Sequence, residues 1–251
     1  MKKILSVQDL SKQYGKGEGA TLALNHISFD VYEGEFLGIM GASGSGKTTL
    51  LNCMATMLRP SSGDVYYKSQ ALSEMSSEEL AEYRGTTMGY LFQNFELLDH
   101  MTGAENILLG PAIHGQQPKK WKTRLHQQAR VFGISEVLDK FPNEMSGGER
   151  QRVAAVRAIL QDPAILFADE PTGALDSRNS KTLLEVLRHS CLEEQRTILM
   201  VTHDPQAAAY CSRILRLSDG VLDHELLRET DESQQHFYER IVLMTAQLEG
   251  G

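Results

Sequence analysis

The sequence predicts an α/β domain organised around a phosphate-binding loop. Residues 41–49, GASGSGKTT, contain a glycine, four residues, a second glycine, a lysine and a threonine, the spacing that defines a P-loop. Residues 35–40 before it, EFLGIM, predict a short buried strand, and the apolar positions of residues 47–58 after it recur at helical spacing. Residues 164–168 and 197–201 are two further apolar segments with the length of buried strands.

The P-loop predicts a site for bound phosphate. Its glycines let successive backbone N–H groups point inward, and the helix that follows adds its positive end at the same place. In other P-loop NTPases the lysine reaches the β and γ phosphates and the hydroxyl after it binds Mg²⁺, roles that fall here to Lys47 and Thr48. The residues expected to bind the nucleotide through this loop are Gly41, Ala42, Ser43, Gly44, Ser45, Gly46, Lys47, Thr48 and Thr49.

Composition excludes several classes of protein. A formal net charge of −8 over 251 residues argues against a nucleic-acid partner, which requires clustered positive charge. The 3 cysteines have an odd count and no ligand-like spacing, as expected for reduced residues of a cytosolic protein. The N-terminal residues lack the apolar core of a signal peptide, and no apolar run is long enough to span a membrane. If the protein serves a membrane, we expect another chain to span it.

The segments before the P-loop predict a small β-rich part. Residues 4–10 and 26–33 have the pattern of strands, and a glycine-rich turn separates them. Tyr14 follows the first strand, where the residues alone favour a core aromatic beside a turn. Residues 64–67 predict another short strand after the P-loop helix.

The middle of the chain predicts an inserted helical subdomain at about residues 94–160. Ser76 and Glu79 form a capping box for a helix through Arg84, and the strand 88–92 then delivers Gln93 to a loop. Helical patterns follow from about residue 102, where Thr102 and Glu105 form a second capping box, and include a polar helix at 118–132. The basic side chains around Trp121 favour a solvated face, with partner contact as the alternative: Lys119, Lys120, Lys122 and Arg124.

A second anion site is predicted where the next helix begins. Ser146 and Glu149 have the spacing of an N-cap and the third helical residue, so the first-turn amides lie over two glycines. The helix should continue to Gln161, before Pro163. The residues of this second site are Ser146, Gly147, Gly148 and Glu149.

Ionisable residues follow two of the buried strands. Asp169 and Glu170 are adjacent at the end of one strand, so their side chains should point in different directions and one can hold a metal while the other faces water. His203 ends the next strand, on the side where α/β proteins bind ligands, with Asp204 as the cap of a helix. A structural role and a functional role for this histidine are equally compatible with its position.

The last part of the chain predicts a hairpin and an amphipathic helix. Residues 213–217 and 221–225 flank Asp219 and Gly220, a dipeptide typical of hairpin turns. Beyond them apolar side chains recur at helical spacing, so a tail helix should dock on the domain or on a partner. These side chains are Phe237, Ile241, Met244 and Leu248.

With these motifs in this order, residues 1–230 resemble the nucleotide-binding subunit of ABC transporters. The resemblance implies an α/β P-loop NTPase with a RecA-like core, an antiparallel N-terminal β part, the helical insertion at about 94–160 and a separate tail at 231–251. It also implies ATP and Mg²⁺ as ligands. The implied roles are adenine stacking for Tyr14, contact with Mg²⁺ and the membrane partner for Gln93, metal binding for Asp169, the general base for Glu170, the D-loop for Asp176 and γ-phosphate contact for His203.

Two residues depart from the usual signature motif of this family. Met145 and Glu149 stand where the family has leucine and glutamine. Because glutamate also caps a helix at its third position, the anion site should be retained. A carboxylate near phosphate would nevertheless weaken nucleotide-driven closure.

Within this superfamily the chain is most similar to the Bce-type ATPases, which serve bacitracin and lantibiotic resistance transporters in Gram-positive bacteria. The similar segments are residues 41–52, 167–177 and 200–214, together with the tail. The resemblance implies a homodimer on the cytoplasmic face of the membrane, a separate permease and a sensor histidine kinase as partner. ATPases of lipoprotein release, macrolide efflux and cell division are the alternative. A soluble ABC ATPase of DNA repair or translation is disfavoured, because the motifs occur once and no long coiled coil separates them.

Overall fold

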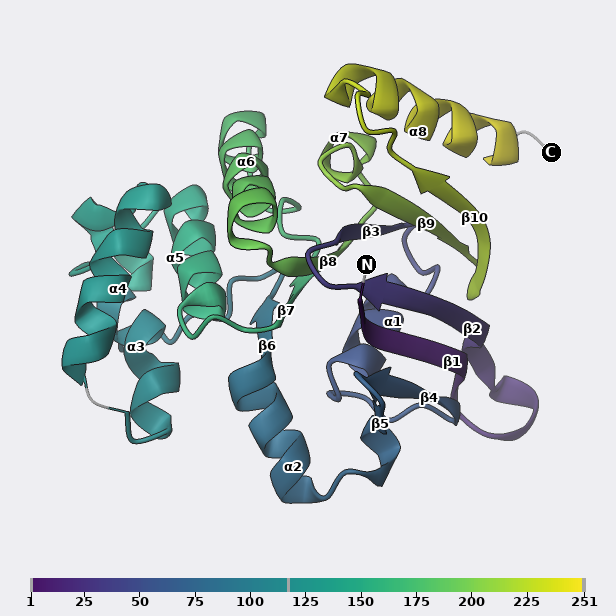
Figure 1. Cartoon of the computed structure of the whole chain (residues 1–251), viewed down its shortest axis with the longest axis horizontal. Helices are drawn as coiled ribbons and strands as arrows, with labels where there is room; N and C mark the ends of the chain where they lie inside the picture. The colour runs from purple at the N-terminus through teal and green to yellow at the C-terminus, as the bar shows by residue number, and fades with distance from the viewer. Residues whose placement is uncertain (1, 117, 250–251) are drawn as a thin grey trace.

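The computed structural model describes residues 2–116 and 118–249, which form two β-sheets and the helices around them (Figure 1). The smaller sheet is antiparallel, with strand order β2-β1-β4-β5. The larger sheet has the order β10-β9-β3-β8-β7-β6, and its strands are parallel except for β10 at the edge. The α/β fold with an antiparallel N-terminal β part is therefore confirmed. The strands are β1 Lys3–Tyr14, β2 Thr21–Tyr32, β3 Phe36–Met40, β4 Ser62–Tyr67, β5 Gln70–Ala71, β6 Met88–Leu91, β7 Ile165–Asp169, β8 Thr197–Thr202, β9 Arg213–Ser218 and β10 Val221–Leu227.

The helices divide between the two faces of the larger sheet. Helix α1 lies on the face toward the smaller sheet, whereas α5 and α6 lie on the opposite face (Figure 1). Helices α3 and α4 pack outside α5, and α2 extends below β6. The helices are α1 Lys47–Met54, α2 Ser77–Glu82, α3 Gly103–Ile113, α4 Pro118–Val131, α5 Gly147–Ile159, α6 Ser177–Glu194, α7 Pro205–Ala208 and α8 Gln234–Glu249.

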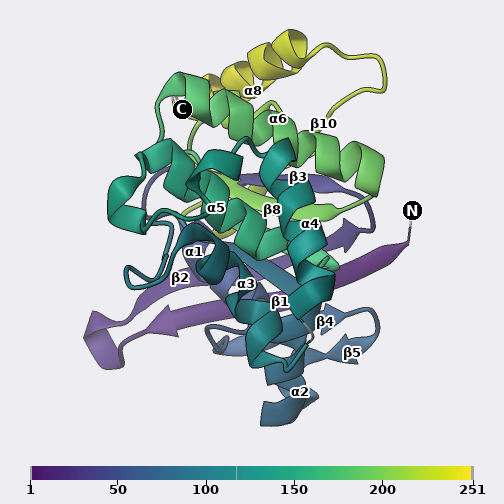
Figure 2. The same ribbon diagram turned by 90° about the vertical axis from the view of Figure 1, so that its left-hand side faces the viewer.

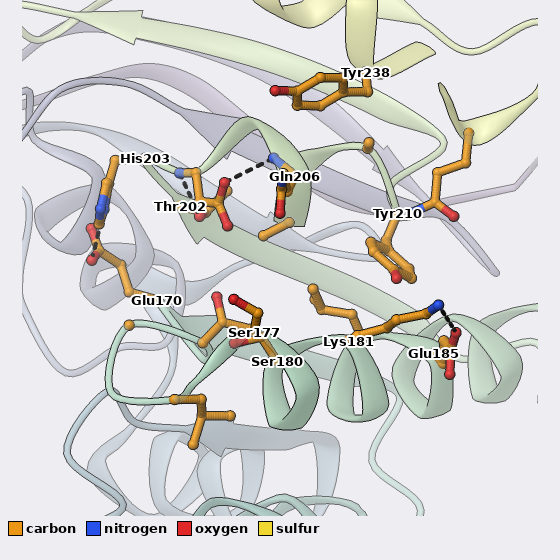
Figure 3. A pocket seen from close by; sticks show the side chains of 18 of the residues that line it. Glu170, Ser177, Ser180, Lys181, Glu185, Thr202, His203, Gln206, Tyr210 and Tyr238 are labelled. Carbon is orange, nitrogen blue, oxygen red and sulfur yellow. Dashed lines mark hydrogen bonds and ion pairs between the residues drawn. The ribbon is translucent and has the colours of Figure 1, made fainter. Parts of the chain in front are cut away.

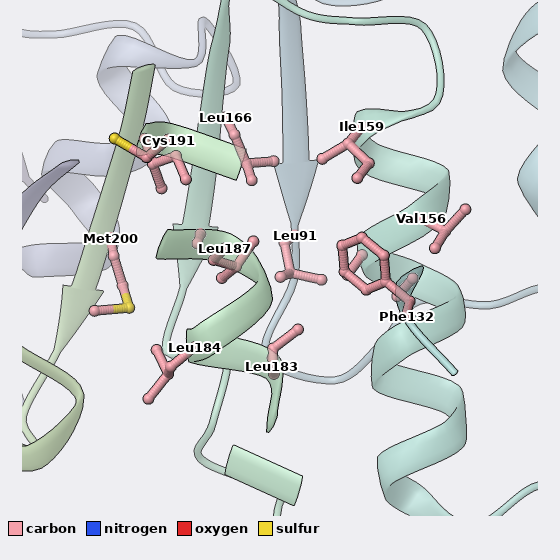
Figure 4. Packing of buried hydrophobic residues seen from close by; sticks show 14 of the residues in the cluster. Leu91, Phe132, Val156, Ile159, Leu166, Leu183, Leu184, Leu187, Cys191 and Met200 are labelled. Carbon is pink, nitrogen blue, oxygen red and sulfur yellow. The ribbon is translucent and has the colours of Figure 1, made fainter. Parts of the chain in front are cut away.

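The buried strands supply both hydrophobic cores because their side chains alternate between the two faces. In β7, Leu166 joins the core formed with α5 and α6, while Phe167 joins the core formed with α1 and the smaller sheet. Met200 and Val201 of β8 divide in the same way. Figure 4 shows the first of these cores, with side chains of α5 and α6 directed at the strands. The central sheet is thus covered on both faces, and its polar groups emerge at the carboxyl ends of its strands.

Several predicted boundaries differ from those observed, because long-range pairing sets them. Strands β1 and β2 run on to the glycine-rich turn, with Tyr14 paired to Thr21, although their polar residues had indicated shorter strands. Helix α1 ends at Met54 instead of residue 58, since Thr56 has a φ of 56° and cannot continue a helix. Helix α2 ends at Glu82 and a π-helical turn, Tyr83–Thr87, follows where an α-helix through Arg84 was expected.

The end of the chain follows the predicted pattern. β9 and β10 form a hairpin in which Asp219 and Gly220 have φ angles of 47° and 77°, as a type I′ turn requires. Helix α8 then packs on the core through Phe237 and Ile241, which are fully buried. The tail helix therefore docks on the domain itself. The side chains of Leu248 and Lys119 lie outside the described residues, and the predicted division at residue 230 stays a prediction.

Figure 2 shows the helices and the smaller sheet around the central sheet. Helices α4, α5 and α3 form one group beside the central sheet, while the smaller sheet runs along another side. Between β6 and β7 the described chain consists mainly of α3, α4 and α5. The position of these helices agrees with the inserted helical segment that the sequence predicts, although its exact limits stay a prediction.

Candidate functional site

The P-loop connects the end of β3 to the start of α1. Two of its glycines, Gly44 and Gly46, have φ angles of 83° and 104°, which L side chains rarely adopt. Gly41 is needed for space, because a Cβ atom there would lie 2.1 Å from the carbonyl oxygen of Leu217. Gly46 is also the N-cap of α1. Because glycine has no side chain, the N-cap residue leaves the first-turn amides of α1 uncovered. The loop and the helix start can therefore bind an anion.

Lys47 is buried at the centre of this loop. Its Nζ donates hydrogen bonds to the carbonyl oxygens of Gly41 at 2.9 Å and Ala42 at 2.8 Å, and lies 3.7 Å from Oε1 of Glu170. Burial lowers the pKa of Lys47, and the nearby carboxylates partly oppose that effect. The structure thus brings a buried cation to the point where phosphates would lie.

A pair of oxygen ligands lies beside the P-loop. Oγ1 of Thr48 donates a hydrogen bond of 3.0 Å to Oδ1 of Asp169, at the end of β7. Burial raises the pKa of Asp169, with a smaller contribution from the charge of Glu170. Carboxylate and hydroxyl oxygens are the ligands that Mg²⁺ prefers, and a cation would offset the cost of burying the carboxylate. The two residues therefore fit a Mg²⁺ ion.

Glu170 occupies a left-handed backbone conformation, with a φ of 42°. Its N–H donates to the carbonyl oxygen of Val201 at 3.0 Å, which ties it to the neighbouring strand β8. One carboxylate oxygen faces Lys47, and the other lies 3.1 Å from Nδ1 of His203, whose side chain is 60% exposed. Asp169 and Glu170 therefore contact different partners, as adjacent residues at a strand end should.

Gln93 and Glu170 both lie close to Gly173, and His203 contacts the Glu170 carboxylate. Gln93 lies in an exposed position after β6, and its Nε2 is 3.4 Å from the point where a Cβ at Gly173 would be. Oε2 of Glu170 lies 3.7 Å from the same point. Figure 3 shows Glu170 and His203 facing one another at one end of a cleft of about 810 Å³ between α6, α7 and α8. His203 also lines a second pocket of about 410 Å³ together with P-loop residues 41–45.

The predicted second anion site lies at the start of α5. Ser146 and Glu149 form the expected capping box: Oγ of Ser146 accepts from the N–H of Glu149 at 3.3 Å, and Oε2 of Glu149 accepts from the N–H of Ser146 at 2.7 Å. The hydrogen bonds that the N–H and the hydroxyl of Ser146 donate to the carboxylate lower the pKa of Glu149. Its carboxylate thus folds back onto the helix start.

Asp176 connects the second site to α6. Its side chain caps that helix by accepting from the N–H of Asn179 at 2.8 Å and from the Asn179 amide at 2.7 Å. The Asn179 side chain in turn covers Gly148, where a Cβ would lie 2.5 Å from it, and accepts a hydrogen bond from Arg152. Asn179 therefore links the signature motif to the D-loop.

Tyr14 lies at the end of β1 and the residue is 44% exposed, which excludes the core position that the residues alone had favoured. Its hydroxyl is 3.5 Å from Oγ1 of Thr49 in α1, so the exposed ring lies next to the P-loop helix. An exposed aromatic ring there can stack on a planar base.

Comparisons with known proteins identify the family. The family model described as "ABC transporter" matches residues 24–173. The chain belongs to the ABC transporter family. It is 42% identical to the ABC transporter ATP-binding protein YxdL of Bacillus subtilis, covering 100% of this chain and 96% of YxdL. It is also 42% identical to the bacitracin export ATP-binding protein BceA of Halalkalibacterium halodurans, covering 98% of this chain and 97% of BceA.

A solved ABC cassette confirms the fold. The dimeric structure of MJ0796, a bacterial ABC transporter cassette, superposes with a TM-score of 0.84 at 32% identity, covering 90% of this chain and 100% of that one. A second dimeric structure of the same cassette holds ADP and Pi after hydrolysis. This chain is accordingly the ATP-binding, ATP-hydrolysing subunit of an ABC transporter. Among residues 2–116 and 118–249, no helix has the length and apolarity needed to cross a bilayer.

Two polar residues of this ABC ATPase site are absent from the sequence-based prediction. Asn179 follows the D-loop, and Gln151 is buried in α5 with its amide near the carbonyl oxygens of Phe92 and Pro171. A glutamine at an apolar helix position was the available signal for Gln151. The contacts of Asn179 depend on the approach of α5 and α6, which the sequence does not reveal.

Proposed function

We propose that this ATPase powers a separate membrane permease that confers resistance to bacitracin or related peptide antibiotics. The observation that supports it best is the similarity to BceA, which extends over nearly the full length of both chains. The permease would free the lipid-linked targets of such antibiotics, and the subunit would lie on the cytoplasmic face of the membrane. A sensor histidine kinase as a further partner rests on the family resemblance alone.

The contacts of Glu170 suit it to activate the attacking water. Lys47 and the P-loop amides would bind the β and γ phosphates, while the exposed ring of Tyr14 would stack on adenine. Mg²⁺ held by Thr48 and Asp169, with Gln93 nearby, would neutralise charge that develops on the phosphate oxygens. Glu170 would then accept a proton from water, with His203 close to the γ-phosphate.

The second anion site would act on ATP bound to another copy of the chain. Ser146 and the amides at the start of α5 have the chemistry of a γ-phosphate site, yet they line neither of the two pockets at His203 and the P-loop. Two copies arranged head to tail would bring each signature motif onto the partner's nucleotide. The dimeric MJ0796 structures support the pairing of two cassettes.

The surface beside Gln93 suits contact with the permease. A groove of about 300 Å³ runs between the loop after β6 and helices α3 and α5, lined by Phe92, Glu96 and His114. Ile113 next to it is 72% exposed, and Leu98 in the same loop is also exposed. Closure of the ATPase dimer would move α3 and Gln93 against the permease and thereby couple hydrolysis to transport.

Replacement of Glu170 by glutamine in the source organism tests the proposal. We expect the Glu170→Gln strain, like a deletion strain, to become sensitive to bacitracin or a lantibiotic, whereas a wild-type copy restores resistance. Unchanged sensitivity to all of these antibiotics, together with a defect in lipoprotein release, macrolide efflux or division, would reject the proposal in favour of the alternative ATPase class.

A further inference from the structure

Gln151 of α5 lies between the two loops that carry the proposed catalytic side chains. Its amide nitrogen donates to the carbonyl oxygen of Pro171 at 2.8 Å and to that of Phe92 at 3.4 Å. Pro171 follows Glu170 directly, and Phe92 directly precedes Gln93. A single fully buried side chain thus contacts the backbone next to both proposed catalytic residues.

The chemistry of the two contacts fixes the orientation of the amide. Both neighbours are carbonyl oxygens, which only accept hydrogen bonds, so the side chain must direct its NH₂ group toward them. Its two N–H donors match the two acceptors. The carbonyl oxygen of the amide is buried with no hydrogen-bond partner among the described residues, a cost that an apolar side chain would avoid. The neighbours Val153, Ala154 and Ala155 on α5 are indeed apolar and buried.

The hydrogen bond from Gln151 to Pro171 helps to fix the strained backbone at Glu170. Glu170 has a left-handed backbone conformation, and both of its backbone polar groups are hydrogen-bonded. Its N–H donates to the carbonyl oxygen of Val201, and its own carbonyl oxygen accepts from the N–H of Gly173 at 3.0 Å, which closes a turn. Pro171 lies within that turn, and Gln151 holds its carbonyl. A left-handed conformation at a non-glycine residue persists only when its surroundings determine it.

The contact to Phe92 reaches the neighbouring loop at the same edge of the sheet. Strands β6 and β7 are parallel and pair Leu91 with Ala168, so Gln93 and Glu170 both follow the carboxyl ends of adjacent strands. The amide of Gln151 therefore sets the distance between these two chain segments from the side of α5.

We propose that Gln151 is a positioning residue for ATP hydrolysis, which aligns Glu170 and Gln93 with one another through the carbonyl groups of Pro171 and Phe92. The inference rests on the proposed roles of Glu170 and Gln93. Gln151 is fully buried and would not itself touch the nucleotide. Its loss should therefore lower kcat while ATP binding at the P-loop is largely retained.

The first test is Gln151→Met in the full chain, which keeps the length of the side chain and removes both donors. At saturating Mg-ATP we expect kcat to fall roughly 10- to 100-fold, because small misplacements of catalytic groups have effects of this size, with KM within about threefold of wild type. Gln127→Met, the same change at an exposed position of α4, is the matched control and should hydrolyse ATP at the wild-type rate. A kcat within about twofold of wild type in folded Gln151→Met would overturn the proposal.

The second test is Gln151→Glu, which gives a readout that a purely structural role would not produce. An ionised carboxylate repels the two carbonyl oxygens, whereas a protonated carboxyl group can donate to one of them. The ratio of the variant's kcat to that of wild type should therefore rise several-fold as pH falls from about 8.5 to about 6, with folding checked by circular dichroism at each pH. A constant ratio contradicts positioning. If neither variant folds, Gln151 is structural and the proposal is wrong.

Glu170→Gln measured in parallel separates this inference from the proposed catalytic roles. If Glu170→Gln hydrolyses ATP like wild type, the assignment of the general base is wrong. If Glu170→Gln is inactive and Gln151→Met is fully active, only the positioning role of Gln151 fails.

Discussion

Lys47 and Glu170 form an ion pair across the nucleotide site, with Nζ 3.7 Å from Oε1. The lysine is buried, and the other oxygen of the same carboxylate faces His203. The P-loop lysine is thus already oriented by groups that surround the phosphate position. Phosphates that bind here would share Lys47 with Glu170, so substrate binding and the state of the proposed base are electrostatically coupled.

Replacement of this lysine should weaken ATP binding. Lys47→Ala removes a buried cation that would pair with the phosphates, and charge-assisted hydrogen bonds of this kind contribute roughly 1.5–3 kcal/mol, which corresponds to a loss of affinity of about 10- to 150-fold. Titration calorimetry with Mg-ATP measures this loss of affinity. Lys120→Ala on exposed α4 is the control. Equal affinities for Lys47→Ala and wild type would show that the P-loop amides alone bind the phosphates.

Replacement of the proposed base should separate binding from hydrolysis. Glu170→Gln keeps the size of the side chain but removes its ability to accept a proton, so we expect hydrolysis to slow by roughly 10² to 10⁴. The P-loop and Thr48 are unchanged and a negative charge beside the phosphates is removed, so ATP should bind at least as tightly as to wild type. Steady-state turnover and titration calorimetry on the same preparation measure hydrolysis and ATP binding separately. Turnover of Glu170→Gln at the wild-type rate would show that Glu170 is not the general base.

Local capping chemistry made much of this fold predictable. Ser76, Thr102 and Ser146 each precede a glutamate by three residues, and all three form the expected capping boxes. These signals depend only on residues within one helical turn. The P-loop and the carboxylates after β7 were likewise recognisable from short, contiguous patterns.

Features that depend on distant partners were not predictable in the same way. The outer parts of β1 are polar and are strand only because β2 and β4 pair with them. The ion pair of Lys47 with Glu170 and the contacts of Gln151 join residues far apart in the sequence, so they require the packing of α5 against the sheet. Tyr14 is exposed for a similar reason, since the turn that follows it extends beyond the core.

Asp169 should lower the stability of the nucleotide-free protein at neutral pH. Burial raises the pKa of Asp169, so the folded protein favours the protonated carboxyl group. The stability gained from this preference is fully present below the pKa of the unfolded state and is lost as pH rises through the pKa of the folded state. Asp169→Asn still accepts the hydrogen bond from Thr48 but avoids the buried charge. We expect its Tm to exceed that of wild type by about 2 °C at pH 7.5, with a smaller difference toward pH 4.

The control for this comparison is Asp99→Asn at an exposed position, which should leave Tm unchanged. Addition of Mg-ATP should then reverse the order, because ligand binding stabilises wild type and the variant lacks a metal ligand. A lower Tm for nucleotide-free Asp169→Asn at pH 7.5 would show that the ionised carboxylate stabilises the fold.

ATP should drive association of two copies when hydrolysis is blocked. In the proposed head-to-tail pair each nucleotide contacts one P-loop and the partner's Ser146, so ATP binds the closed pair better than the open one. Mass action should shift Glu170→Gln protein toward dimers in Mg-ATP, measured by multi-angle light scattering. Lys47→Ala in the same background serves as a control that should remain monomeric. A strictly monomeric Glu170→Gln protein at saturating ATP, alone and with its permease, would reject the composite site.

Glu149 offers a test of how the signature motif of this chain departs from that of its family. Its carboxylate accepts the N–H of Ser146, and its pKa is lowered by that bond, so its stabilising contribution is present at neutral pH and lost as pH falls through the folded pKa. Glu149→Gln can accept the same bond and should cost less than about 1 kcal/mol, whereas Glu149→Leu loses the cap and should cost about 1 kcal/mol.

Glu149→Gln should also strengthen the ATP-driven association of two copies. Ionised Glu149 places a negative charge at the helix start that would face the partner's γ-phosphate, and its removal reduces repulsion. In the Glu170→Gln background we therefore expect Glu149→Gln to lower the ATP concentration needed for half-maximal dimerisation several-fold, with a smaller effect at high salt. The carboxylate already accepts hydrogen bonds from Ser146, so an unchanged concentration would mean that these capping bonds hold the charge away from the phosphate.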